Sequence, residues 1–162
     1  SLLEKGTIDA PLSLTETAGG SKYRAYVDSQ TGKEAITKYW VLAQGPRYSL
    51  VASHPVTGRT HQIRCHFSHA GFPLVGDCKY GAPAPPAWCP RLPLHCLRVR
   101  AADHTGETID VTSGLPDDFA AMLDAVEQEW ATGDVPGRDR WREAIRELSG
   151  DGGLQSEEAA CN

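Results

Sequence analysis

The chain has 162 residues, of which 40% are hydrophobic and 23% are charged. This balance is typical of one globular domain and excludes a disordered or fibrous chain. No apolar run approaches the roughly 18 residues that cross a bilayer, and the first residues lack the apolar stretch of a signal peptide. The five cysteines are odd in number and form no C-x-x-C pair, which argues against a disulfide framework or a zinc ribbon and favours a reducing compartment.

The net charge of −5 is unevenly distributed along the chain. Residues 1–102 carry a net charge of +6, whereas residues 103–162 carry −11. From Ala35 to Gly76 there is no acidic residue, although Lys, Arg and His recur through this window. The window is therefore a candidate phosphate-facing surface. Such a window also arises by chance in buried strands, so the charge alone leaves both interpretations open.

The first predicted elements form a β-hairpin. The segment from Lys33 to Ala43 is rich in β-branched and aromatic residues, which predicts a strand. A Gly45-Pro46 turn follows, and Tyr48 to His54 is the predicted antiparallel partner.

A helical period begins at Thr60 and stops before Gly71. Its apolar residues recur at i, i+4 and i+7, which predicts a roughly three-turn helix buried through Ile63, Phe67 and Ala70. His61 and Arg64 lie three residues apart on another face, which we expect to look into a cleft or solvent.

The last predicted elements are a second hairpin and two helices. The strands are Leu94 to Ala101 and Glu107 to Thr112, around a turn at 103–106. Asp117 is a candidate N-cap for the first helix, and Arg138 to Leu148 predicts the second. We expect the apolar stripes of both helices to be core: Phe119, Leu123, Val126 and Trp130 in the first, and Trp141, Ile145 and Leu148 in the second.

The densest chemistry lies between His54 and Gly81. The helix start presents Arg59, Thr60, His61 and Arg64, so that backbone N–H groups, a hydroxyl and two guanidinium groups converge where a helix favours anions. A phosphate or a carboxylate fits such a place.

Two other interpretations of this segment are weaker. Cys65, His66 and His69 have spacings that suit a metal on one helix, but no acidic ligand and no second ligand pair accompanies them. A hydrolase is disfavoured because no G-x-S-x-G motif is present. Histidines satisfied by hydrogen bonds within the fold explain the pattern better.

The string GRTHQIRCHFSHAGFPLVGD, residues 58–77, closely resembles the C-terminal signature of the RluA-type RNA pseudouridine synthases. Five further segments follow the family's order: the G-x-I-x-x-P-L match from Gly6 to Leu12, the G-K-x-A-x-T-x-Y match from Gly32 to Tyr39, Leu94-His95, the turn from Thr105 to Glu107, and Leu115 to Phe119. The resemblance extends from about Leu3 to Asp124.

One feature of the family is missing. The family's catalytic aspartate lies in an H-R-L-D-x-x-T-S-G motif upstream of the matched segments, and this motif is absent from the 162 residues. Asp28 begins a superficially similar D-S-Q-T-G string, but it lacks the preceding H-R-L, and we interpret it as a loop residue. Because the chain begins with Ser1, we expect a processed product, an internal fragment or a deliberately shortened chain, and because it has no nucleophile in the family position we expect it to be inactive alone.

The resemblance implies an enzyme that isomerises uridine to pseudouridine in structured RNA such as rRNA or tRNA, with no cofactor and no metal. It gives Arg64 the role of pairing with the absent catalytic aspartate and holding its pKa down. It places Arg59, Thr60 and His61, together with Lys38, against the RNA. A catalytically inactive RNA-binding or ribosome-associated module, and a protein-interaction domain using the acidic region from Trp130 to Leu148, are the alternatives.

The family fold is α/β in the α+β sense, with a mixed, largely antiparallel sheet and flanking helices, of which this chain would supply the second half. We expect residues 1–130 to be the C-terminal part of the catalytic domain, 131–150 an additional helix, and 151–162 an acidic disordered tail. A half-sheet leaves an unpaired edge, so the missing N-terminal half or a partner should complete it. We expect an intracellular protein without membrane contact, in the cytoplasm or in an organelle with its own ribosomes.

Overall fold

The computed structural model describes residues 5–16, 23–130, 138 and 140–149. They form antiparallel strand pairs and three α-helices, which confirms the α+β class. The chain divides into two compact units. The first contains Ser1–Val41 and Leu50–Pro93, and the second contains Leu42–Ser49 and Leu94–Asn162.

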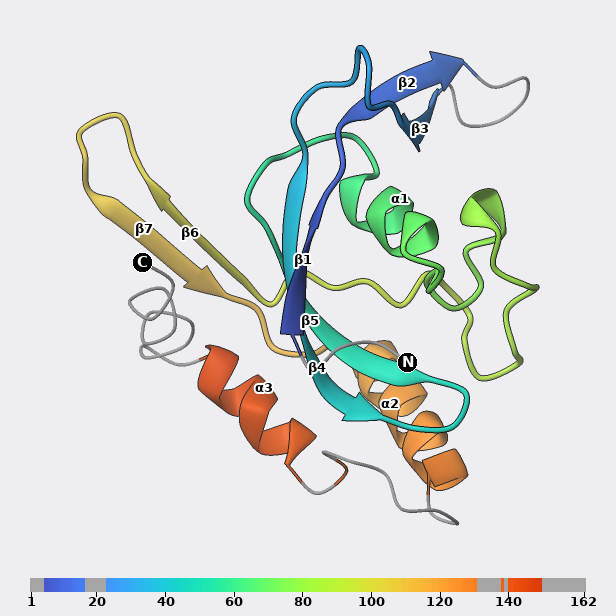
Figure 1. Cartoon of the computed structure of the whole chain (residues 1–162). Coiled ribbons are helices and arrows are strands. Elements are labelled where there is room, and N and C mark those ends of the chain that lie inside the picture. The colour runs from blue at the N-terminus through green and yellow to red at the C-terminus, as the bar shows by residue number, and fades with distance from the viewer. Residues whose placement is uncertain (1–4, 17–22, 131–137, 139, 150–162) are drawn as a thin grey trace. The chain divides into compact units, whose positions relative to one another are not determined.

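One three-stranded sheet has the strand order β1-β4-β5 (Figure 1). Its strands are β1 (Lys5–Asp9), β4 (Ile36–Gln44) and β5 (Ser49–Pro55). β1 runs antiparallel to β4, from Lys5 opposite Trp40 to Asp9 opposite Ile36. The predicted hairpin is confirmed, since β4 pairs with β5. β4 begins at Ile36, three residues later than predicted, and Lys33 forms an isolated bridge with Leu12.

Gly6 has a packing role in this sheet. It lies opposite Tyr39, whose side chain is buried. A Cβ atom at Gly6 would lie 2.6 Å from the Tyr39 hydroxyl oxygen and 2.8 Å from the ring carbon that carries it. The Tyr39 ring therefore occupies the space that any larger residue at position 6 needs.

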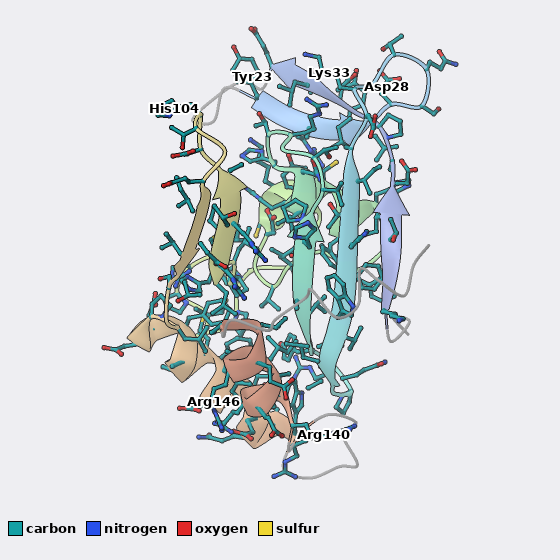
Figure 2. The ribbon with its side chains drawn as sticks, turned by 90° about the vertical axis from the view of Figure 1, so that its left-hand side faces the viewer. Tyr23, Asp28, Lys33, His104, Arg140 and Arg146 are labelled. Atoms are coloured by element: carbon teal, nitrogen blue, oxygen red, sulfur yellow. The ribbon has the colours of Figure 1, made fainter. Side chains whose placement is uncertain are left out.

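β2 (Leu12–Glu16) and β3 (Tyr23–Val27) form a separate antiparallel pair. The loop after β3 contains Asp28, which lies beside Lys33 in Figure 2. The Asp28 carboxylate accepts hydrogen bonds from the backbone N–H groups of Gln30 and Thr31 and from the hydroxyls of Ser13 and Thr31. These bonds hold the Asp28 pKa well below its usual value. Asp28 is thus a turn-forming residue, as its sequence context indicates.

The helix α1 (Gln62–His69) is shorter than expected and buries a different face. Its buried residues are Gln62, Cys65, His66 and Phe67. Ile63 is only half-buried and Ala70 is exposed, so the predicted apolar stripe is wrong at two of its three positions. The predicted apolar stripe was wrong because polar side chains of this helix have hydrogen-bond partners inside the protein. Such partners offset the free-energy cost of burying a polar group.

In the second unit, β6 (Arg98–Ala102) and β7 (Thr108–Thr112) form the predicted hairpin, a two-stranded ribbon in Figure 1. β6 starts four residues later than the sequence indicated. Arg98 donates to the Asp110 carboxylate through both Nε and Nη2 on one face of the ribbon. Val99 and Val111 face each other on the other.

The helices of the second unit are α2 (Asp117–Trp130) and α3 (Trp141–Ser149). All four predicted core positions of α2 are buried. One of them, Trp130, packs against Gly45 and leaves no room for a side chain there, because a Cβ at Gly45 would lie 2.0 Å from the indole nitrogen. Trp141 is buried as predicted, while Ile145 and Leu148 are half-buried. The predicted tail, residues 151–162, lies outside the described residues. No described helix is long and apolar enough to cross a membrane.

Candidate active site

The start of α1 is fixed to β4 by one buried amide, that of Gln62, which is 3% exposed. Its Oε1 accepts from the Thr57 hydroxyl at 2.8 Å and from the Arg59 backbone N–H at 3.0 Å. Its Nε2 donates to the Ile36 carbonyl at 2.9 Å and to the Thr37 hydroxyl oxygen at 3.0 Å. Because every hydrogen-bonding position of the amide is used, the helix start has a defined place against the sheet.

His66 continues this network. Its side chain is fully buried, with Nε2 3.0 Å from the Ala10 carbonyl and Nδ1 2.9 Å from the Thr37 hydroxyl. A carbonyl can only accept, so Nε2 carries the proton and Nδ1 accepts from Thr37. Burial lowers the His66 pKa. His66 is therefore a neutral structural histidine, which agrees with the interpretation favoured from the sequence.

The turn before α1 presents Arg59, Thr60 and His61. The Arg59 side chain is exposed, and its Nε donates to the Glu34 carbonyl at 2.8 Å. Thr60 is exposed. His61 is the N-cap residue and has φ 56° and ψ 21°, the one positive φ among the described residues other than glycine. A left-handed conformation at a residue with a side chain is uncommon and persists only where surrounding contacts hold it.

Arg64 faces away from this network and pairs with Asp77. Its Nε and Nη2 each lie 2.7 Å from one oxygen of the Asp77 carboxylate. The Asp77 side chain is 1% exposed and that of Arg64 is 20% exposed. This two-pronged hydrogen bond raises the pKa of the guanidinium. Nη1 of Arg64 has no hydrogen-bond partner within the part of the chain that the structure describes.

Tyr80 lies at the centre of the surrounding groups. It belongs to the short 3-10 helix η1 (Cys78–Tyr80) and is 3% exposed. The guanidinium carbons of Arg64 and Arg24 lie 4.9 Å and 5.5 Å from its ring centre, within the range of cation–π attraction. The Tyr80 hydroxyl accepts from the Ala25 backbone N–H at 2.9 Å and lies 3.0 Å from Nδ1 of His61. We call Arg24, His61, Arg64, Asp77 and Tyr80 the Tyr80 cluster.

The bonding of Tyr80 determines the tautomer of His61. Among the described residues, Nδ1 of His61 is the acceptor within reach of the Tyr80 proton, and the Tyr80 hydroxyl oxygen already accepts from the Ala25 backbone N–H. His61 therefore carries its proton on Nε2. Burial is the main cause of a lowered His61 pKa, and the neighbouring charge of Arg64 acts in the same direction. A neutral His61 with Nε2–H as a donor is the result.

The Tyr80 cluster combines positive charge with a single carboxylate. Arg24, Arg64 and the adjacent Lys79 are cations, whereas Asp77 is its only acidic residue. Such a site attracts an anion, and the remaining Nη1 edge of Arg64 matches a carboxylate or a phosphate oxygen. In the described residues, no group of three or more His, Cys, Asp or Glu side chains is arranged to hold a metal ion.

The structure brings together some of the residues predicted for the site. His61 and Arg64 share the Tyr80 cluster, and Arg59 and Thr60 precede it directly in the chain. Lys38 lies elsewhere: its neighbours Thr37 and Tyr39 face α1, so that the alternation of β4 directs Lys38 to the opposite face of the sheet.

The sequence interpretation missed Asp77 and Tyr80. Both belong to the string G-D-C-K-Y-G that follows the helix, and Asp77 is the first acidic residue after the acid-free window. A basic helix followed by one isolated acidic residue was the available signal.

Comparison with known proteins relates this chain to one family. Residues 1–69 match the family model described as RNA pseudouridylate synthase. The chain is 37% identical over 123 residues to an uncharacterized RNA pseudouridine synthase, YlyB, of Bacillus subtilis, with 75% of this chain and 39% of YlyB covered. It is 33% identical over 138 residues to the ribosomal large subunit pseudouridine synthase D of Haemophilus influenzae, with 77% of this chain and 41% of that protein covered.

Solved structures support the same relationship. The human RNA pseudouridylate synthase domain containing 1 is matched with a TM-score of 0.57 at 26% identity, over 83% of this chain and 62% of that chain. The human domain containing 4 is matched with a TM-score of 0.54 at 25% identity, over 75% and 56%. The chain spans about 40% of the length of the curated relatives described above. The agreement of sequence, motif order and fold shows that this chain belongs to the RluA-type RNA pseudouridine synthase family.

Proposed function

We propose that this chain is the C-terminal portion of the catalytic domain of an RNA pseudouridine synthase that isomerises uridine in structured RNA such as rRNA or tRNA. The observation that carries the proposal is Arg64, a guanidinium held by Asp77 at 2.7 Å with its Nη1 edge left over for a second acidic group. The names of the relatives, which include a ribosomal large subunit pseudouridine synthase, support the same substrate class.

The reaction replaces the bond between N1 of uracil and the ribose by a bond from C5, and the C5 proton is released. The family's aspartate attacks the nucleoside after the base has been flipped out of the RNA. In this proposal Arg64 pairs with that aspartate through Nη1 and keeps it ionised in a partly dry cleft, because an adjacent positive charge lowers a carboxyl pKa.

Contacts to RNA are assigned to the turn before α1. Arg59 and Thr60 are exposed and suit phosphate oxygens. His61 offers Nε2–H as a neutral donor, which suits a base or phosphate oxygen at the rim of the pocket. Lys38 faces the other side of β4, so any contact that it makes would be to a different stretch of RNA.

Turnover requires an aspartate that is absent from the family position in these 162 residues. We therefore infer that the isolated chain binds RNA weakly and releases no tritium from C5-labelled uridine. A longer gene product that carries an H-R-L-D motif about forty residues before Gly6 (a spacing expected from the family resemblance and from usual strand and loop lengths) should release it, and we call such a product the complete gene product. Turnover by the 162 residues alone that Asp28→Ala abolishes would make Asp28 the nucleophile and refute this assignment.

The role of Arg64 is tested in the complete gene product. Arg64→Met should nearly abolish turnover while RNA affinity stays within a few fold, and Arg64→Lys should rescue poorly because lysine lacks the planar two-pronged donor. Since Arg64→Met also leaves Asp77 buried without its partner, the matched control is the double variant Arg64→Met/Asp77→Asn, which removes the orphaned charge.

The double variant should remain inactive although its stability recovers. Recovery of turnover together with stability would mean that Arg64 only holds the fold. A tenfold loss of RNA affinity, with turnover at saturating RNA unchanged, would make Arg64 an ordinary phosphate contact. RNA binding without turnover in the complete gene product itself would instead identify an inactive RNA-binding module.

A further inference from the structure

Backbone hydrogen bonds and loop packing hold Asp77 in place. Its backbone N–H donates to the Leu74 carbonyl at 3.0 Å, and its carbonyl accepts from the N–H groups of Tyr80 and Ala82 at 2.9 Å and 3.1 Å. Gly76, immediately before it, has a φ of 69° and packs against Pro85, where a Cβ would lie 2.7 Å from that ring. The loop therefore presents the Asp77 carboxylate in one direction.

Two sides of the Arg64 guanidinium are thereby occupied. Asp77 takes the Nε–Nη2 edge, and the Tyr80 ring lies 4.9 Å from the guanidinium carbon. The Asp77 carboxylate has no other hydrogen-bond donor within the described residues, so its buried charge depends on Arg64. Nothing in the described part of the chain occupies the Nη1 edge of Arg64, which remains to meet another group.

We propose that Asp77 is a positioning residue for catalysis, which aims the Nη1 edge of Arg64 at the nucleophilic aspartate and shares the arginine's charge with it. The inference rests on the proposed function. Arg64 would then bind two carboxylates, that of Asp77 and that of the nucleophile. The charge of Arg64 favours ionisation of the nucleophile, whereas the charge of Asp77 opposes it. Asp77 thus sets both the direction of the arginine and the strength of its effect.

The other charged and titratable groups around the pair come from three elements. Arg24 lies on β3, His61 at the start of α1, and Lys79 and Tyr80 on η1. Arg24 and Lys79 are cations, while His61 and Tyr80 are neutral at pH 7 because burial lowers the pKa of the first and raises that of the second. Asp77 is consequently the only described negative charge beside Arg64, and its removal should have a distinct electrostatic effect.

The experiment compares Asp77→Asn with Asp110→Asn in the complete gene product. Asparagine keeps the shape of the side chain and removes its charge. Asp110 is the matched control, since it makes the same two-pronged bond to Arg98 on β6, outside the Tyr80 cluster. Tritium release is followed as a function of RNA concentration and pH, and Asp77→Glu is included as the conservative variant.

We expect Asp77→Asn to lower kcat by 10- to 100-fold with KM within threefold. The acidic limb of the kcat/KM profile should move to lower pH by about one unit, because losing a nearby negative charge lowers the pKa of the nucleophile. Asp77→Glu should restore the position of this limb, and Asp110→Asn should leave it unchanged. A fall in kcat without a pH shift, accompanied by a lower Tm, would overturn the proposal and make Asp77 purely structural.

Two further measurements keep the inference separate from the proposed function. If Arg64→Met abolishes turnover while Asp77→Asn leaves kcat and the pH profile unchanged, only the inference fails; if both variants keep full turnover, the proposed function fails. In the 162-residue chain, the ¹⁵N signal of Arg64 Nε–H should be protected from exchange and lose that protection in Asp77→Asn. An unprotected signal before substitution would refute the geometry directly.

Discussion

The stability of the chain should fall as the pH drops below about 6.5, and His66 should be a principal cause. In the folded chain this ring is fully buried, donates to the Ala10 carbonyl and accepts from Thr37. A proton added at Nδ1 would place a donor against a hydroxyl that already accepts from Gln62 and would put a charge in the core. Burial accordingly lowers the His66 pKa below its usual 6.5.

The sign and size follow from proton linkage. A group with a lowered folded pKa binds more protons in the unfolded chain, so its contribution to stability is present above the unfolded pKa and is lost as the pH falls. For a histidine that stays neutral in the folded state, the loss between pH 7.5 and pH 5.5 is at most about 1.4 kcal/mol. His61, whose pKa is lowered as well, adds a loss in the same direction.

The assay is urea unfolding of the 162-residue chain at pH 7.5, 6.5 and 5.5. His66→Gln should lower the free energy of unfolding at pH 7.5 by about 1–3 kcal/mol, because one buried hydrogen bond is lost. It should also reduce the number of protons taken up on unfolding at acidic pH by about one. His104→Gln is the control, because this histidine is exposed in the turn between β6 and β7 and its substitution should keep the wild-type dependence. A His66→Gln chain that retains the full loss between pH 7.5 and 5.5 would refute the assignment.

Three other variants test separate parts of the structure. Gly6→Ala should destabilise the chain by about 1–3 kcal/mol in urea unfolding, since its Cβ overlaps the Tyr39 ring; equal stability would show that Tyr39 can move aside. Leu123→Ala should cost about 2–5 kcal/mol because α2 buries this side chain, and a cost below 1 kcal/mol would contradict the assigned core. Arg59→Ala should lower the slope of log RNA affinity against log salt by about 0.7 to 0.9, whereas Arg142→Ala, which removes an arginine paired with Glu127 and Asp124, should leave it unchanged.

The sequence predicted the elements more accurately than it predicted their buried faces. The hairpin of β4 and β5 and the core stripe of α2 follow from local patterns, since β-branched runs and a 3.6-residue period act over neighbouring residues. The face of α1 does not follow from such a pattern. Gln62 and His66 replace the predicted apolar stripe because Thr37 and Ala10, distant in sequence, supply their hydrogen-bond partners. Periodicity contains no information about such partners.

The same limit explains why the sequence did not indicate the partner that Arg64 has in this chain. The resemblance drew attention to Arg64 and to an aspartate upstream, whereas the described chain supplies Asp77, 13 residues downstream. The two assignments are compatible because a guanidinium has more than one edge, and Asp77 uses only Nε and Nη2. An arginine without Asp77 would be a mobile charge that must be ordered when the nucleophile arrives, at a cost in side-chain entropy. In the proposed mechanism, an Arg64 that Asp77 and Tyr80 hold in advance would meet the nucleophile without that cost.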